Sequence, residues 1–120
     1  WLGYRDMPTL PKTEAELNAL VQSLLVYKAA PLAGVWASAP YLHNASVPTL
    51  YDLLLPADKR PKKFTLGNRE YDASKVGYQT KGGGYTFDTS IKGFSNVGHE
   101  YGTTITDEER WALVEYLKSM

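Results

Sequence analysis

Two histidines are the side chains of this sequence best suited to hold a metal or a cofactor. His43 lies within residues 40–44, which read PYLHN, and His99 follows Gly98 in a glycine-rich segment. Glycine there lets the backbone fold closely around an imidazole. As a ligand, either histidine would use a neutral ring whose second nitrogen donates to an acceptor. A structural or solvent-facing role stays open for both.

The sequence contains no cysteine, which limits the chemistry further. Disulfides, thiolate zinc sites, iron–sulfur clusters and cysteine nucleophiles are excluded. Covalent attachment of haem c within this chain is excluded too, because it requires a C-x-x-C-H motif. Two sulfur ligands remain, Met7 and Met120. Methionine can ligate haem iron, but packing or exposure is the simpler interpretation of both.

The spacing of these residues matches no common catalytic motif. His99-Glu100 begins an H-E-x-x-H zinc motif, but the second histidine is missing. Gly82–Gly84 is not followed by a lysine and a helix, so no phosphate-binding loop is predicted. Neither G-x-S-x-G nor a dinucleotide fingerprint occurs. The sequence therefore assigns no catalytic residue.

Charge and composition narrow the class of protein. The 120 residues include 13 Lys+Arg and 13 Asp+Glu, so no nucleic-acid or anionic-membrane partner is expected. Apolar residues make up 43% and charged residues 22%, which is typical of a globular chain. No run of about 20 apolar residues predicts a membrane span. The start at Trp1 rather than Met, without a visible signal peptide, is interpreted as a piece of a larger protein.

Two helices are predicted near the ends of the chain. Thr13 with Glu16, and Thr106 with Glu109, have the spacing of a capping box. The first helix is expected to continue until Pro31. Both helices carry an apolar stripe that we expect to pack in a core. The stripes comprise Leu17, Leu20, Val21, Leu24 and Leu25 in the first helix, and Trp111, Leu113, Val114 and Leu117 in the second.

The segment between these helices predicts less regular structure. Ser46 is expected to cap a short helix that has Pro48 in its first turn and buries Leu50, Leu53 and Leu54. Residues 64–66 and 85–87 are predicted to be short strands within a long irregular stretch, 64–102. Long loops of this kind are usually functional or wrap a ligand. The expected fold is mainly α, with long irregular loops and a short β-hairpin, in a single unit made of an irregular arm (1–12) and a helical domain (13–120).

Four basic residues, Lys59, Arg60, Lys62 and Lys63, form a short basic loop. Such a loop is commonly a solvated surface. The alternative is a docking patch for an acidic partner, whose binding should depend on salt.

Residues 27–56 resemble the C-terminal region of bacterial di-haem c-type cytochromes, which include the cytochrome c peroxidase-like proteins and the rubber-oxygenase branch. The shared phrase is G-[IV]-W-A-x-A-P-Y-L-H-N, followed by a helix that opens S-V-P-x-L. The resemblance extends to about residue 120 and ends in the TDEER helix start. Ala45 departs from it, because these proteins usually have glycine there, which puts the local turn in doubt.

The resemblance implies the C-terminal portion of a cytochrome c-like domain, in a periplasmic or secreted haem protein that performs electron transfer or peroxidase- or oxygenase-type chemistry. Haem c would be attached to the remainder of the protein or to a companion chain, and a redox partner protein is implied. Residues 64–102 would wrap the haem, and His99 would be its distal axial ligand. His43 would lie near the haem edge or make a structural hydrogen bond, and Trp36 and Tyr41 would line the pocket.

A second hypothesis is a haem-free binding or structural module on a degenerate cytochrome c scaffold. The visible spectrum separates the two, because only a haem protein shows a Soret band.

Overall fold

The computed structural model describes residues 12–24 and 31–120. The chain divides into two units, Trp1–Pro31 and Leu32–Met120, which are considered separately. Several predictions lie outside the described residues: those for the arm up to residue 11, including Met7, for the Leu24 side chain, and for the first helix over residues 25–30.

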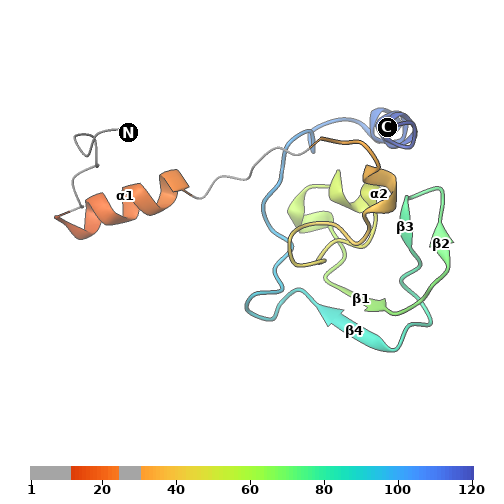
Figure 1. The fold of residues 1–120 in the computed structure, drawn as a ribbon, viewed down its shortest axis with the longest axis horizontal. Helices are drawn as coiled ribbons and strands as arrows, with labels where there is room; N and C mark the ends of the chain where they lie inside the picture. Colours follow the sequence, from red (N-terminus) through yellow and green to blue (C-terminus); the bar gives the residue numbers. More distant parts are fainter. Residues whose placement is uncertain (1–11, 25–30) are drawn as a thin grey trace, which may run out of the picture. The chain divides into compact units, whose positions relative to one another are not determined.

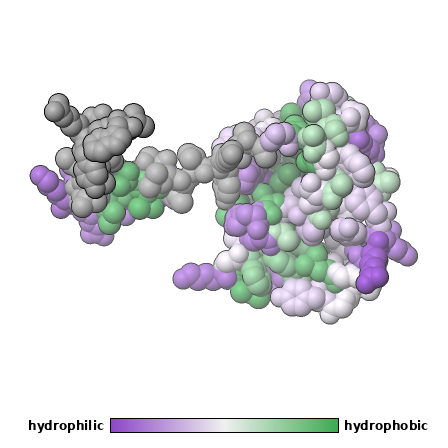
Figure 2. All heavy atoms as spheres, viewed as in Figure 1, coloured by the Kyte–Doolittle hydropathy of each residue, from purple (hydrophilic) through white to green (hydrophobic). Residues whose placement is uncertain are grey.

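Helix α1, Glu14–Leu24, begins where the sequence predicts. The Glu16 N–H donates to Thr13 Oγ1 at 3.2 Å, and Glu16 Oε2 accepts from the Thr13 N–H at 3.3 Å, which confirms the capping box. The expectation that its apolar stripe packs in a core is wrong for three residues, because Leu17, Leu20 and Val21 are 49, 41 and 44% exposed. Figure 2 shows apolar and strongly polar side chains together on this helix. A capping box and an apolar stripe therefore predict that a helix forms, but they do not predict which residues pack against it.

The core of the second unit forms around helix α2, Leu50–Leu53. Thr49 caps this helix, since its hydroxyl accepts from the Asp52 N–H at 3.1 Å. The prediction that Ser46 is the cap is wrong. Ser46 is buried and lies three residues before Thr49, which is the residue that has the extended backbone conformation of a cap. The buried apolar side chains of the core cluster are Tyr41, Val47, Leu50, Leu54, Val76, Val114 and Leu117.

Helix α3, Asp107–Leu117, packs against α2. Thr106 and Glu109 form the predicted capping box. The Trp111 ring stacks on Tyr51 with centroids 4.4 Å apart, and Val114 and Leu117 are buried. The predicted apolar face of the terminal helix is confirmed for these residues.

The second unit contains two small antiparallel sheets, which lie along its lower and right-hand sides in Figure 1. Strand β1, Lys63–Leu66, pairs with β4, Tyr85–Asp88, and Phe64 lies opposite Phe87. Between them, β2, Tyr71–Asp72, pairs with β3, Gly77–Tyr78. The predicted strands 64–66 and 85–87 are confirmed, and both phenylalanines are buried.

The expectation of a mainly α fold is wrong. Within residues 12–24 and 31–120, α-helix is confined to α1, the single turn α2, and α3; short 3-10 turns lie at Val35–Ala37 and Ala57–Lys59. Residues 63–88 instead contain the four strands, joined by turns and irregular segments. Glycine and β-forming residues fill this stretch, and they favour turns and strands over helix.

Of the helices in the described ranges, none is both long and apolar enough to cross a membrane.

Candidate functional site

The His99 loop, residues 93–103, is fixed by hydrogen bonds from Arg60. The Arg60 side chain is only 2% exposed. Its NH1 group donates to the carbonyl oxygens of Asn96 at 2.6 Å and Gly98 at 2.7 Å. Its NH2 group donates to the carbonyl oxygen of His99 itself at 3.0 Å. The backbone that carries the imidazole is therefore bound directly to a buried guanidinium.

The same guanidinium also binds the segment that follows α2. Arg60 Nε donates to Leu55 O at 2.9 Å, and NH2 donates to Leu53 O at 3.3 Å. With the three loop carbonyls, these contacts use every N–H donor of the side chain. Burial lowers the pKa of Arg60 and the nearby Glu100 opposes this shift, but a guanidinium stays protonated in proteins. Its charge is stabilised by carbonyl dipoles converging from two segments.

Asn44, in the PYLHN phrase, holds the start of the His99 loop. Its Nδ2 donates to Gly93 O at 3.2 Å and to Ser95 O at 2.9 Å. The end of the loop is held by Glu100, whose Oε1 accepts from the Ala57 N–H at 3.1 Å. Asn44 thus joins the PYLHN phrase, which contains His43, to the His99 loop.

His99 sits in a backbone conformation that few non-glycine residues adopt. Its φ is 50°, after Gly98 at 88°, and such a left-handed pair is stable only where the surroundings impose it. The Arg60 contact to the His99 carbonyl supplies that restraint. The imidazole is half-buried and lies edge-on to the Tyr101 ring, with centroids 6.4 Å apart. The loop thus holds the imidazole of His99 on a backbone that hydrogen bonds keep in place.

The other predicted site residues lie elsewhere in the second unit. The His43 side chain is exposed. Tyr41 is buried in the core, where its hydroxyl donates to Val35 O at 3.0 Å and burial raises its pKa. The structure brings Tyr41 into the core cluster rather than to an open surface.

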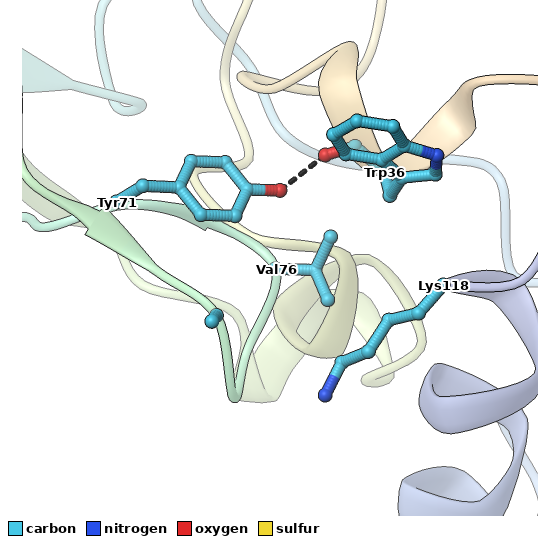
Figure 3. Close-up of a pocket in the computed structure, with 5 residues that line it drawn as sticks. Trp36, Tyr71, Val76 and Lys118 are labelled. Atoms are coloured by element: carbon cyan, nitrogen blue, oxygen red, sulfur yellow. Dashed lines mark hydrogen bonds between the residues drawn. The ribbon is translucent and has the colours of Figure 1, made fainter.

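Trp36 lines an open hollow of about 370 Å³ together with Tyr71, Ala73, Val76 and Lys118. We call it the Trp36 hollow. Figure 3 shows the Tyr71 hydroxyl directed at the Trp36 carbonyl, to which it donates, with Val76 between the aromatic residues and Lys118. Neither histidine nor Tyr41 is among the five lining residues. The predicted pocket residue Trp36 and the predicted ligand His99 therefore belong to different surfaces.

The basic loop does not expose all four of its basic side chains, as the alternative of a four-residue docking patch requires. Arg60 is buried, and Lys63 Nζ pairs with Asp88 Oδ2 at 2.8 Å. Lys59, Lys62 and Lys63 are all exposed, as the interpretation of a solvated loop predicts. The sequence pattern could not distinguish a buried arginine from its solvated neighbours.

A haem c fits this chain only in part. The chain lacks the cysteines that would attach it, and its described residues hold no cluster of three metal-ligating His, Cys, Asp or Glu side chains. A half-buried imidazole on a braced loop is suitable as one axial ligand. The chain therefore has a histidine that could serve as an axial ligand, but it lacks the cysteines that attach haem c.

Comparison with known proteins supports a cytochrome c-like relationship. Residues 26–65 match the family model described as RoxA-like, cytochrome c-like. The matched region includes Trp36, His43, Asn44 and Arg60, and it ends before the His99 loop.

Two curated relatives, both from Sinorhizobium fredii, match most of the chain. The uncharacterized protein y4iJ is 50% identical over 111 residues, covering 83% of this chain and 19% of its own length. The uncharacterized protein y4iM is 39% identical over 117 residues, covering 78% of this chain and 27% of its own length. The match thus spans about a fifth and a quarter of these proteins.

Arg60 and Asn44 build the site, yet the sequence gives little sign of their role. Arg60 reads as one of four basic residues, and its partners are main-chain carbonyls that no side-chain pattern reveals. Asn44 had a signal, since it adjoins His43 in the specific PYLHN phrase. Tyr71 and Lys118 carry no local signal, because the hollow forms only when β2 and the end of α3 meet Trp36.

Proposed function

We propose that this chain is a cytochrome c-like unit with a haem-related redox role, in which His99 supplies an axial ligand to a haem c attached elsewhere. The main support for this proposal is the hydrogen bond from Arg60 to the His99 carbonyl oxygen, because it fixes the backbone of the histidine that lies in a glycine-rich loop. The family match over residues 26–65 supports the class. Haem iron would supply the one-electron chemistry, and this chain would bind and orient it.

The rest of the proposal follows from haem c chemistry. The attaching C-x-x-C-H segment would belong to the remainder of a larger protein or to a companion chain. The relatives are several times longer than their matched regions, so they have room for such a segment. The unit would work in the periplasm or outside the cell and exchange electrons with a redox partner, in electron transfer or in peroxidase- or oxygenase-type chemistry.

A haem c peptide that carries its own C-x-x-C-H segment and one open coordination position is a direct probe. When this peptide is added to the purified chain, its visible spectrum should change from high-spin to low-spin as an imidazole fills the open position on the iron. His99→Ala should abolish the change, and His43→Ala is the matched control that should retain it. Equal spectra for wild type and His99→Ala would overturn the assignment of His99.

A haem-free binding module is the second candidate, and the Trp36 hollow favours it. The hollow is apolar, contains an exposed tryptophan, and has no histidine in its lining. Under this alternative the haem c peptide stays high-spin with both histidine variants and with the wild type.

A further inference from the structure

We propose that the Trp36 hollow binds a small planar aromatic molecule that carries one carboxylate. None of His99, Arg60 and Asn44 lines the hollow, so this site can be tested separately from the assignment of His99. The shape of the hollow, its exposed rings, its single charge and its strained floor all favour such a ligand.

The size and lining of the hollow suit a small ligand. Its volume of about 370 Å³ lies within the range of small-molecule sites, about 300–1,000 Å³. Trp36 is 47% exposed and Tyr71 is 39% exposed, so both rings keep apolar surface in water that a ligand could cover. Aromatic side chains favour offset or edge-on contact with another ring. The two rings therefore favour an aromatic guest over an aliphatic one.

The rings are held in place before any ligand arrives. The Tyr71 hydroxyl donates to the Trp36 carbonyl, which ties β2 to the turn at Val35–Ala37. Tyr78 packs edge-on against the Tyr71 ring, with centroids 5.7 Å apart. Binding thus requires little ordering of these side chains, which lowers its entropic cost.

Val76 gives the hollow a strained apolar floor. This side chain is 1% exposed, yet its φ is 61°, which is rare for a β-branched residue. Its N–H donates to Asp72 O at 2.8 Å and its carbonyl accepts from the Leu50 N–H at 2.9 Å, so the conformation is imposed from both sides. Strain of this kind is concentrated at ligand-binding and active sites.

Lys118 decides the charge of the ligand. It is the one charged residue among the five that line the hollow. Its Nζ pairs with Glu115 Oε1, and the Glu115 side chain is 65% exposed. An exposed ion pair of this type contributes little to stability. A ligand carboxylate could therefore replace Glu115 as the partner of Lys118 at small cost.

The probe is 2-naphthoate, compared with the neutral 2-naphthalenemethanol, in calorimetric titrations of the full chain. We expect saturable binding of naphthoate, and Lys118→Gln should weaken it about fivefold or more because a charge-assisted contact is lost. The same variant should leave binding of the alcohol unchanged. Lys118→Arg should restore naphthoate binding, and Lys92→Gln, at an exposed site outside the hollow, should behave as wild type.

Trp36→Leu tests the aromatic wall. It should weaken binding of both the acid and the alcohol, and because Trp36 is half exposed the variant should fold normally, as a thermal melt will show. The proposal fails if naphthoate does not bind saturably, if Lys118→Gln binds it as tightly as wild type, or if Trp36→Leu changes neither affinity. Failure here would leave the assignment of His99 untouched, because the haem c peptide assay reads a different surface.

Discussion

The His99 loop and the Trp36 hollow are stabilised by different forces. The loop is held through polar contacts, with a guanidinium 2% exposed and bound to five carbonyls. The hollow is apolar, partly open and tied by one hydrogen bond between its lining residues. Buried polar contacts are costly to break, whereas half-exposed rings are cheap to change. The loop should therefore tolerate few substitutions, and the hollow many.

The largest effect should come from Arg60→Ala. It leaves one buried and four partly buried hydrogen bonds to carbonyls without their donor, so we expect the free energy of unfolding to fall by roughly 3–5 kcal/mol. Urea denaturation followed by circular dichroism measures this. Lys62→Ala, on the same basic loop but exposed, should stay within about 0.5 kcal/mol of wild type. A loss below about 1 kcal/mol for Arg60→Ala would show that the guanidinium does not hold the loop.

Asn44→Ala should have a moderate effect on the His99 loop and on its own turn, where Asn44 Oδ1 also accepts from the Ser46 N–H at 3.3 Å. It removes the donor to Gly93 and Ser95, and we expect a loss of about 1–2 kcal/mol. Hydrogen exchange should accelerate for amides of the His99 loop. The matched control is Asn68→Ala, since Asn68 donates to Lys81 O at 2.7 Å in another turn. Faster exchange in the His99 loop of that control would contradict a local role for Asn44.

Trp36→Leu should hardly change stability. The ring is 47% exposed, so the loss should not exceed about 0.5 kcal/mol. The same denaturation curves give this value. A loss approaching that of Asn44→Ala would mean that the hollow is part of the core, and the contrast between the two regions would collapse.

Acid should affect the β1–β4 pair and spare the Arg60 contacts, because a guanidinium does not titrate. A hydrogen bond from Lys63, assisted by Ser90, lowers the pKa of Asp88 from 3.8 to about 2. A carboxyl group whose pKa is lower in the folded state stabilises the fold above its unfolded pKa. This stabilisation is lost as the pH falls through the folded pKa. Stability should therefore drop between about pH 4 and 2, and Asp88→Asn should remove part of that slope in unfolding curves. The pKa of Asp107, lowered chiefly by Tyr51, accounts for a further part.

Local signals predicted local structure well. The capping boxes at Thr13 and Thr106 and the strands around Phe64 and Phe87 depend on neighbouring residues, and the sequence placed them correctly. The prediction of Ser46 as the cap was wrong because serine and threonine are both favoured at this position, so residue type alone could not separate Ser46 from Thr49. The backbone takes the conformation of a cap at Thr49. The mainly α expectation failed because residues 63–88, predicted as irregular apart from two short strands, contain four strands, and their composition favours turns and strands.

Long-range features were beyond sequence reasoning. Leu17 and Val114 occupy equivalent stripes, yet only Val114 is buried, since burial depends on partners that periodicity does not name. Arg60 reaches carbonyls 36 to 39 residues away. Such contacts depend on where the main chain runs after folding, so the site could be predicted only as far as its histidine.

The contact between Arg60 and position 99 ends on a carbonyl oxygen, which every amino acid has. The loop can therefore keep its shape while the side chain it presents is exchanged. His99→Met would place a thioether on the same braced backbone, and in the proposed haem site methionine raises the reduction potential of the iron. One buried arginine thus separates the construction of the loop from the choice of ligand, so the electronic properties of such a site could evolve by single substitutions without rebuilding the fold.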